Sequence, residues 1–399
     1  MNNPYLPSVS IIIPTLNEEN YIRSAISSFT TSAYPNIEHI YIVDGGSVDR
    51  TIEIVRSLSQ QDSRIKFLDN PQKYQSYAIN LALKYIESDV LLRADAHAEY
   101  GEEYVEKCVE TLLDHRALNV GGSTRFVAKG NFQAGVALAA YSILGNGGAK
   151  HRNVEYNGYG ETVFPGCFWR LALKNISGYD TSMVVNEDAE LNIRLSKSNF
   201  DYDRIPYYQN RRSPNLDSLD PHDRSAVYIN NEIEVYYFPR DTWYSLIRQY
   251  FKYGTGRYIT AQKHSDRPQL RGKLPFIVIS ILLLLSILDI LTPNLHIPSY
   301  ELLALCGVIS LAESLRVNVQ FIDTFEDIIW RGKKERLPSF ICRYFYSTIA
   351  LVTMPLAHFA GYCYQVVKDK LPQPKIDRSV DSRQERLPQG FWYESPEKN

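Results

Sequence analysis

Four short apolar runs near the start of the chain each end in a cluster of polar residues. The first run, residues 9–13, stops at Pro14, and the fourth, residues 90–92, leads into Arg93. Apolar runs of this length are typical of parallel strands that are buried on both faces. Apolar residues recur at helical spacing between the runs, which predicts crossover helices and hence an α/β fold. Asn17 is expected to cap the first of these helices. The second and third runs are residues 37–43 and 65–68.

The polar clusters after these strands are expected to share one edge of the sheet, where ligands bind in open α/β folds. The fourth cluster carries Asp95 and His97, two residues apart. If the strand geometry continued to His97, both side chains would point the same way and could share one cation bound to phosphate oxygens. A polar turn with one hydrogen-bonded aspartate is the structural alternative. The four clusters are residues 14–18, 44–47, 69–70 and 95–97.

Several classes of protein are disfavoured by the sequence. The patterns GxxxxGK[ST] and GxGxxG do not occur, which weighs against a P-loop nucleotide triphosphatase or an NAD enzyme. A net charge of −2 and the lack of a basic run in the first 270 residues argue against a nucleic-acid partner. The cysteines form no CxxC pair, so reduced, unpaired thiols are expected. They are Cys108, Cys167, Cys306, Cys342 and Cys363.

The C-terminal part contains three apolar segments. Residues 274–292 form a nearly unbroken apolar run, interrupted by Asp289, whose length is close to that needed to span a bilayer. Residues 300–315 and 340–367 are weaker candidates because they carry charged residues, and a buried helical hairpin is the alternative. The expected organisation is a soluble domain, a membrane-anchoring helical region and a polar, flexible tail, at residues 1–260, 261–370 and 371–399.

The charges around these segments predict an orientation. A basic loop runs from Arg331 to Arg336, whereas the link at residues 293–298 has no Lys or Arg, so the basic loop is expected in the cytoplasm. The N-terminus lacks the pattern of a signal peptide, which predicts a multi-pass protein of the cell inner membrane with its soluble domain in the cytoplasm. Residues 325–330 would suit an interfacial helix. The tail would be exported if the third segment crosses the membrane, and cytoplasmic if that segment lies in the interface.

Four motifs carry a resemblance to a known family. In their order along the chain they resemble family 2 glycosyltransferases of the GT-A fold, over roughly residues 8–260. The resemblance implies a mixed, mainly parallel α/β sheet followed by C-terminal membrane helices. Within the family, the R-x-D-x-H form of the third motif is similar to succinoglycan-type exopolysaccharide glucosyltransferases. The motifs are IIIPTLNE at 11–18, VDGGSVDRT at 43–51, DAH at 95–97 and NEDAELNIRL at 186–195.

The family resemblance implies a nucleotide-sugar site along the strand ends. Asp44 would accept a hydrogen bond from the base, usually uracil, and Asp95 would reach the ribose or diphosphate and a divalent cation. His97 replaces the second aspartate of the usual DxD motif. Because imidazole suits Mn²⁺ better than Mg²⁺, the choice between these cofactors stays open. The implied donor-site residues are Pro14, Thr15, Asn17, Glu18, Asp44 and Asp95. Lys73 and Arg93 could also face the diphosphate.

The ED pair of the fourth motif is implied to be catalytic. Asp188 would act as the base for the acceptor hydroxyl, and Glu187 would position the acceptor or brace the loop. A single base opposite the leaving group predicts inversion at the anomeric carbon. The structural alternative is a helix start, because acidic residues favour the first turn of a helix and Asn186 is a good cap.

Two further groups of residues are weaker candidates. Trp169 and Arg170 could form an acceptor-side surface, although such a Trp is more often part of a core. Arg248, Gln249 and Arg257 precede the first apolar segment and could contact the donor diphosphate or anionic lipid, with ordinary juxtamembrane charge as the alternative. The QxxRW motif of processive synthases is not formed after Gln249, which favours transfer of a single sugar.

The sequence therefore predicts an inverting hexosyltransferase that moves one sugar from a nucleotide sugar, a UDP-hexose, to a lipid-linked saccharide during exopolysaccharide or surface glycan synthesis. A polyprenyl-phosphate sugar synthase and a processive polysaccharide synthase are the alternative enzymes. A non-catalytic scaffold that binds a nucleotide sugar is the alternative from another class of protein.

Overall fold

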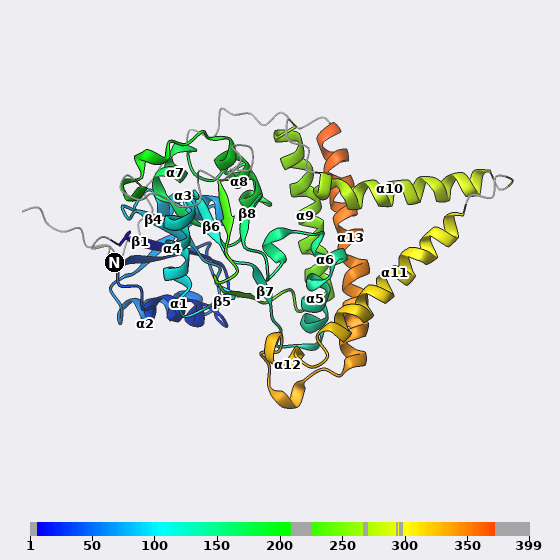
Figure 1. The fold of residues 1–399 in the computed structure, drawn as a ribbon, viewed down its shortest axis with the longest axis horizontal. Helices are drawn as coiled ribbons and strands as arrows, with labels where there is room; N and C mark the ends of the chain where they lie inside the picture. Colours follow the sequence, from blue (N-terminus) through cyan, green and yellow to red (C-terminus); the bar gives the residue numbers. More distant parts are fainter. Residues whose placement is uncertain (1–5, 209–225, 266–269, 293, 295–297, 372–399) are drawn as a thin grey trace, which may run out of the picture. The chain divides into compact units, whose positions relative to one another are not determined.

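The computed structural model of the protein describes residues 6–208, 226–265, 270–292, 294 and 298–371. The chain forms two compact units, drawn in Figure 1. The first contains the described residues of 1–124 and 154–236, and the second contains Arg125–Asn153 and the described residues of Tyr237–Lys375. The domain boundary expected at residue 260 stays a prediction, and the expected tail beyond residue 371 lies outside the described part.

The first half of the main sheet consists of the four strands expected from the sequence. They are parallel, in the order β3-β2-β1-β4, and crossover helices connect them. This arrangement brings the carboxyl ends of all four strands to one edge, as expected. The strands are β1 (Val9–Thr15), β2 (Ile37–Asp44), β3 (Ile65–Asp69) and β4 (Val90–Arg93), and the helices are α1 (Ile22–Thr30), α2 (Thr51–Ser59) and α3 (Gln75–Leu83).

The second half of the sheet is mixed and continues in the order β4-β9-β6-β10-β8. β9 is antiparallel to both β4 and β6, and β8 is antiparallel to β10. The sheet is thus the mixed, mainly parallel one that was expected. The added elements are α4 (Tyr104–His115), β6 (Asn119–Gly121), β8 (Gly158–Gly160), β9 (Cys167–Trp169), α7 (Arg170–Asn175), α8 (Glu187–Lys197) and β10 (Val227–Ile229). A second sheet has the order β5-β11-β7, with β5 (Ala98–Tyr100), β7 (Thr124–Phe126) and β11 (Val235–Tyr237).

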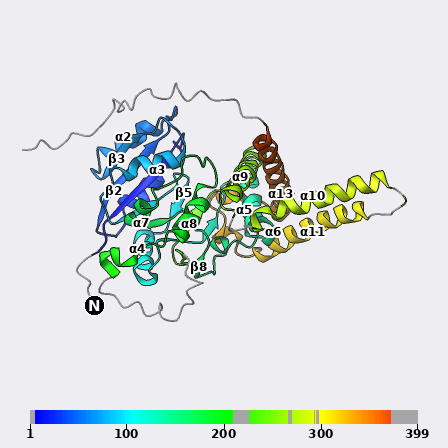
Figure 2. The same cartoon turned by 90° about the horizontal axis from the view of Figure 1, so that it is seen from above.

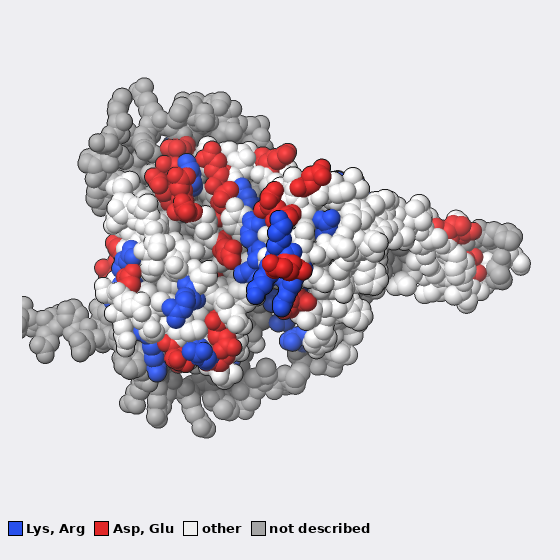
Figure 3. Space-filling view, turned by 90° about the horizontal axis from the view of Figure 1, so that it is seen from below, with Lys and Arg blue, Asp and Glu red and all other residues white. Residues whose placement is uncertain are grey.

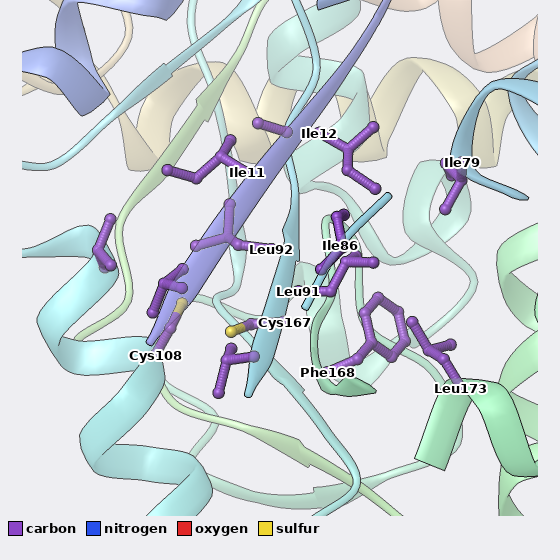
Figure 4. Packing of buried hydrophobic residues seen from close by; sticks show 14 of the residues in the cluster. Ile11, Ile12, Ile79, Ile86, Leu91, Leu92, Cys108, Cys167, Phe168 and Leu173 are labelled. Atoms are coloured by element: carbon purple, nitrogen blue, oxygen red, sulfur yellow. The ribbon is translucent and has the colours of Figure 1, made fainter. Parts of the chain in front are cut away.

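The main hydrophobic core lies around the centre of the large sheet. Figure 4 shows Ile11 of β1, Leu92 of β4 and Cys167 of β9 close together, and all three are fully buried. Burial of apolar strand residues on both faces is what holds the sheet between its helices. Cys108 and Cys167 are buried free thiols, and none of the cysteines forms a disulfide among the described residues, as expected.

The second unit is helical. α5 (Asn131–Tyr141), α9 (Trp243–Lys263) and α13 (Phe340–Lys370) pack against one another, while α10 (Leu270–Leu291) and α11 (Ser299–Gln320) form a hairpin that leaves them (Figures 1 and 2). In the part of the chain that the structure describes, three helices are long and apolar enough to cross a membrane, α10, α11 and α13. The three apolar segments of the sequence are therefore confirmed as long helices. On the face that Figure 3 shows, the hairpin carries few charged residues, and acidic ones lie near its tip.

An interfacial helix was expected at residues 325–330, and the structure is helical only in the first part of this segment. The segment holds only one short helix, α12 (Phe325–Ile328). Phe325 and Trp330 are buried in a core cluster with residues of α5 and α11, and the Trp330 indole donates a hydrogen bond to the Lys333 carbonyl at 3.1 Å. Both aromatic rings are thus used in packing and are not free to enter a membrane interface.

Candidate active site

The loops that follow β1 and β2 are tied together at the carboxyl edge of the sheet. Asp44, opposite Thr15 in the strand register, is buried. Its carboxylate accepts hydrogen bonds from the Gly46 and Ser47 amides at 2.8 Å and from the Ser47 hydroxyl at 2.5 Å. Asp44 therefore shapes the loop in which it lies, at the edge where it was expected.

Asn17 joins the two loops and does not cap a helix. Its φ of 56° is left-handed, its amide donates to the Ser47 hydroxyl at 2.8 Å, and its side-chain oxygen accepts from the Val48 amide at 2.9 Å. Helix α1 begins only at Ile22, without a side-chain cap, so the expected helix cap was wrong. The side chain instead bridges the ends of β1 and β2.

Lys73 lies beside the same loops. Its φ of 66° is left-handed, its side chain is exposed, and its Cα would be 3.4 Å from a Cβ placed on Gly45. This position next to the β2 loop brings a positive charge to the edge of the sheet at which the nucleotide-sugar site was expected.

A buried arginine is the centre of the site. The Arg93 side chain is only 1% exposed, and its guanidinium forms an ion pair with Asp188 at the start of α8. It also contacts Asp95 at 3.4 Å and Glu187 at 3.7 Å. The Gln75 side-chain oxygen accepts a further hydrogen bond from it at 2.9 Å. Arg93 therefore joins the carboxylate after β4 to the two carboxylates of α8.

The charges of this cluster depend on one another. Burial opposes the charge of Arg93, but the carboxylates of Asp188 and Asp95 hold its pKa well above the usual value. Burial, together with the charge of Asp188, raises the pKa of Glu187 to about 7. Near neutral pH, Glu187 is thus divided between its acid and carboxylate forms, whereas an exposed glutamate would be fully ionised.

Tyr179 contributes a hydroxyl to the cluster. It donates a hydrogen bond to Asp188 at 3.1 Å, and burial raises its pKa well above the usual value, so it remains a donor at neutral pH. The side chain of Asn80 holds the Tyr179 backbone with two hydrogen bonds of 2.7 and 2.8 Å. Asp188 therefore has two positioned partners, Arg93 and Tyr179.

The loop after β4 differs from the expected geometry. β4 ends at Arg93, and Ala96 and His97 form a turn, so the premise of a strand continuing through His97 was wrong. The His97 Nδ1 lies 3.2 Å from a carboxylate oxygen of Glu18, and the Asp95 amide donates to the Tyr100 hydroxyl at 2.5 Å. Within the described residues no three His, Cys, Asp or Glu side chains are grouped to hold a metal ion.

Trp169 and Arg170 lie at the other end of β4. In the antiparallel pair of β4 and β9, Trp169 is opposite Val90, and its indole donates to the Tyr208 hydroxyl at 2.9 Å. Trp169 is buried, and the Arg170 guanidinium donates to the Ser88 carbonyl at 2.6 Å. Both residues are at the amino end of β4, away from Asp95, so the acceptor-side surface expected at these positions was wrong and Trp169 belongs to the core.

Phe164 is an aromatic residue that does lie at the cluster. The Arg93 guanidinium is 5.0 Å from the centre of its ring, and the Arg93 amide donates to the nearby Gly166 carbonyl at 2.9 Å. Phe164, Gln75 and Tyr179 were not identified from the sequence. They belong to no motif, and only the antiparallel register of β9 and the packing of α3 bring them to Arg93.

Arg248, Gln249 and Arg257 belong to α9 of the second unit. The Gln249 side chain donates to the Tyr253 hydroxyl at 3.0 Å, and the Arg248 guanidinium lies 5.7 Å from the centre of the Tyr244 ring. A role of these residues toward a donor diphosphate or a lipid stays a prediction.

The fold is shared with a solved enzyme. A mannosyltransferase from Pyrobaculum calidifontis, PcManGT, solved in complex with GDP-Man and Mn²⁺, superposes with a TM-score of 0.54 at 14% identity. The match covers 92% of this chain and 89% of that chain. Together with the mixed sheet described above, this likeness shows the GT-A fold.

The family follows from sequence comparison. Residues 10–173 match the model of glycosyl transferase family 2. The chain is 36% identical over 285 residues to the succinoglycan biosynthesis protein ExoA of Rhizobium meliloti (strain 1021), covering 70% of this chain and 79% of the relative. It is 25% identical over 264 residues, 64% of this chain and 74% of the relative, to the dolichyl N-acetyl-alpha-D-glucosaminyl phosphate 3-beta-D-2,3-diacetamido-2,3-dideoxy-beta-D-glucuronosyltransferase of Methanococcus voltae. The protein belongs to the family 2 glycosyltransferases.

Proposed function

We propose that the protein transfers one hexose from a nucleotide sugar, a UDP-hexose, to a lipid-linked saccharide with inversion at the anomeric carbon. The observation that carries this proposal is that Arg93 contacts both Asp95 and Asp188. One side chain thus joins the expected donor-side carboxylate to the expected base. A reaction in which a hydroxyl attacks as a diphosphate leaves needs these two groups close together.

On the donor side, the nucleoside would lie along the loops after β1 and β2, bordered by Pro14, Thr15, Asn17 and Glu18, with Asp44 toward the base. Lys73 would attract the diphosphate. Asp95 and His97 offer one carboxylate and one imidazole, a donor set that fits Mn²⁺ or Mg²⁺ if the diphosphate supplies further oxygen ligands. A cation held there would stabilise the negative charge that develops on the leaving diphosphate.

On the acceptor side, Asp188 takes the proton from the attacking hydroxyl. Arg93 and Tyr179 fix the orientation of its carboxylate, which is the requirement for a general base. Glu187 contributes to the orientation of the acceptor, and Phe164 offers the face of an aromatic ring to a sugar. With one base on the side opposite the leaving group, the product has the inverted configuration.

The setting of the reaction is proposed from the relatives and the apolar helices. The names of two relatives refer to succinoglycan biosynthesis and to a sugar transfer to a dolichyl phosphate-linked sugar. We place the protein in the cell inner membrane, anchored by α10 and α11, with the catalytic unit in the cytoplasm. Anchoring would raise the effective concentration of an acceptor held in the same membrane.

The test is transfer by the purified full-length protein from a panel of labelled UDP- and GDP-sugars, with Mn²⁺ or Mg²⁺, to membrane lipid extracts. A lipid product extended by one sugar supports the proposal. A sugar phosphate lipid would identify a polyprenyl-phosphate sugar synthase, and a long polymer would identify a processive synthase.

Asp188→Asn tests whether the protein is a catalyst that uses this base. We expect transfer to fall by about 100-fold or more because the general base is lost, while donor binding is retained. Asp203→Asn is the matched control, since Asp203 is exposed and forms a surface ion pair with Arg116. Equal turnover in the wild type and Asp188→Asn would point to another base, and donor binding without any turnover in the wild type would favour the scaffold.

A further inference from the structure

Helix α13 has two different faces. From Ile341 to Val367 its exposed residues are apolar and lie on one side of the helix as a stripe, and the exposed charged residues 368–370 follow at its end. Its opposite face packs on α5 and α9, where a Cβ on Gly135 would overlap Tyr346. In the most apolar stretch of each helix, 39% of the residues of α13 are buried, whereas none of those of α10 are. The most exposed stripe residues are Ile341, Phe345, Val352, Leu356, Tyr364 and Val367, at 77%, 56%, 42%, 51%, 51% and 58%.

Helix α9 runs beside α13 in the same direction. The Trp243 indole, at the start of α9, donates to the Thr353 hydroxyl at 3.0 Å, and the Tyr258 hydroxyl, near its end, donates to Asp369 at 3.0 Å. Between these contacts the backbones approach so closely that a Cβ on Gly254 would overlap the carbonyl oxygen of His358. If this part of α13 lay at a given depth in a membrane, α9 would therefore lie at the same depth.

Helix α9 cannot lie in the hydrocarbon layer at low cost. Arg248 and Lys252 are exposed, and both lie between the two contacts that align α9 with α13. If α13 crossed the bilayer, these charges would lie beside its middle and would have to enter the apolar layer. An orientation with α9 toward water and the stripe of α13 toward lipid avoids this cost.

Among the described residues, the side-chain contacts of the hairpin with α13 lie near the base of the hairpin. At the start of α10, the ring of Phe276 lies 4.5 Å from that of Tyr362, and near the end of α11 the Ser314 and Ser347 hydroxyls are 2.6 Å apart. These contacts are about 20 Å apart along α13. Farther along the hairpin, Leu284 is 57% exposed, and Figures 1 and 2 both show α10 and α11 running away from α13. Three helices that crossed a bilayer together would instead be in contact along much of their length.

From these contacts we infer that only α10 and α11 cross the membrane, and that α13 lies in the membrane–water interface with its apolar stripe against the acyl chains. The apolar stripe thus contacts the lipid bilayer, and α9 covers the side of α13 that faces water. With two crossings, the basic loop before α13 and the end of α13 are on the same side of the membrane. The inference rests on the proposed insertion of α10 and α11 but not on the transfer chemistry.

Depth measurements test the orientation of α13. Single spin labels are placed at Ile341, Val352, Leu356 and Val367 of the full-length protein, in vesicles of phosphatidylcholine and phosphatidylglycerol, after Cys306, Cys342 and Cys363 are changed to serine. The collision rates with oxygen and with a water-soluble nickel chelate give the depth of each label. We expect all four labels at a similar, shallow depth. Greatest depth at Val352 and Leu356, with Ile341 and Val367 near water, would overturn the inference.

Labels at Leu284 and Val308 serve as the matched control on the hairpin. They are expected in the acyl layer, and labels that stay at water depth would overturn both this inference and the proposed anchoring, while the transfer assay is unaffected. Strong spin–spin broadening along the α13 stripe without oxygen contact would show a second copy of the chain as the occupant and would also overturn the inference.

Sidedness provides a second, independent measurement. Lys334→Cys precedes α13, Lys370→Cys lies at its end, and Thr292→Cys follows α10. In sealed inverted membrane vesicles, a membrane-impermeant maleimide is expected to label Lys334→Cys and Lys370→Cys but not Thr292→Cys. Opposite labelling of the first two variants would mean that α13 crosses the membrane.

Discussion

At the scale of single residues, Arg93 contacts both the carboxylate after β4 and the carboxylates of α8 with one side chain. Its planar guanidinium reaches Asp95, Gln75 and Asp188, and these partners come from three different elements. A lysine ammonium cannot reproduce this set of contacts, because it has no rigid fork of donors. We expect Arg93→Lys to lower kcat by about 100-fold through misplacement of Asp188. Arg204→Lys, at an exposed position, is the control, and a normal kcat in Arg93→Lys would contradict this role.

Glu187 should make stability depend on pH. Its pKa is raised from 4.5 to about 7 by burial and the charge of Asp188, so between these values the folded chain holds a proton that the unfolded chain has lost. The contribution of Glu187 to the free energy of unfolding is therefore most favourable below pH 4.5 and decreases as the pH rises through about 7. The total decrease is on the order of 3 kcal/mol at most. We expect Tm to fall over this range in the wild type relative to Glu187→Gln, measured by thermal unfolding in detergent. Parallel Tm curves would rule out the raised pKa.

His97 is the residue that sets the proposed donor set apart from the acidic pair usual in the family. Replacing the imidazole with a carboxylate in His97→Asp would restore the acidic pair that is usual in the family and would favour Mg²⁺. We expect the ratio of transfer rates with Mg²⁺ and Mn²⁺ to rise several-fold in this variant, measured at saturating metal. An unchanged ratio would indicate that His97 is not a metal ligand.

At the scale of elements, the close contact of α9 and α13 depends on glycine. A Cβ on Gly254 would overlap the carbonyl oxygen of His358, so Gly254→Ala must push the helices apart, at a cost of about 1–3 kcal/mol. Gly307→Ala is the matched control, because a Cβ there meets no atom within 4 Å. The measurement is Tm in detergent, and an equal Tm for the two variants would show that the contact is not tight.

The elements show what local sequence can predict and what it cannot. The four parallel strands were predicted because each is a mainly apolar run that ends in a polar cluster. β6, β8, β9 and β10 have three residues each, too few to show a periodicity, and their places in the sheet depend on pairing between distant segments. The helix of the ED pair was predicted, but Asn186 takes a left-handed conformation and forms no side-chain cap.

The same distinction applies to the site. Asp95, Glu187 and Asp188 belong to motifs and could be identified from the sequence. Trp169 was misplaced because the direction of β9 was unknown, and antiparallel pairing with β4 carries it to the wrong end of the strand. Tyr179 could not be found because its place beside Asp188 depends on the side chain of Asn80 and not on a local pattern.

At the scale of the whole molecule, the second unit is built from separate parts of the chain. Arg125–Asn153 belongs to it together with the C-terminal helices. Ala137 and Leu138 of α5 are buried in a cluster with Val317 and Phe325. We expect the fragment 1–260 to be aggregated when expressed alone, because it keeps α5 but lacks the helices that cover it. The measurement is size-exclusion chromatography, and a soluble, monomeric fragment would contradict the expectation.

The path of the backbone therefore limits how a water-soluble form of this enzyme could be engineered. The polypeptide passes from one unit to the other after Thr124, returns after Asn153 and leaves again after Tyr236. If the chain were cut at any one of these points, each fragment would contain part of both units or lack part of its own. Removing only the distal part of the α10–α11 hairpin and joining the cut ends with a short polar linker keeps all three passages, and it leaves Val317 of α11 in the packing around α5. The apolar stripe of α13 would need polar substitutions as well before such a form could be soluble.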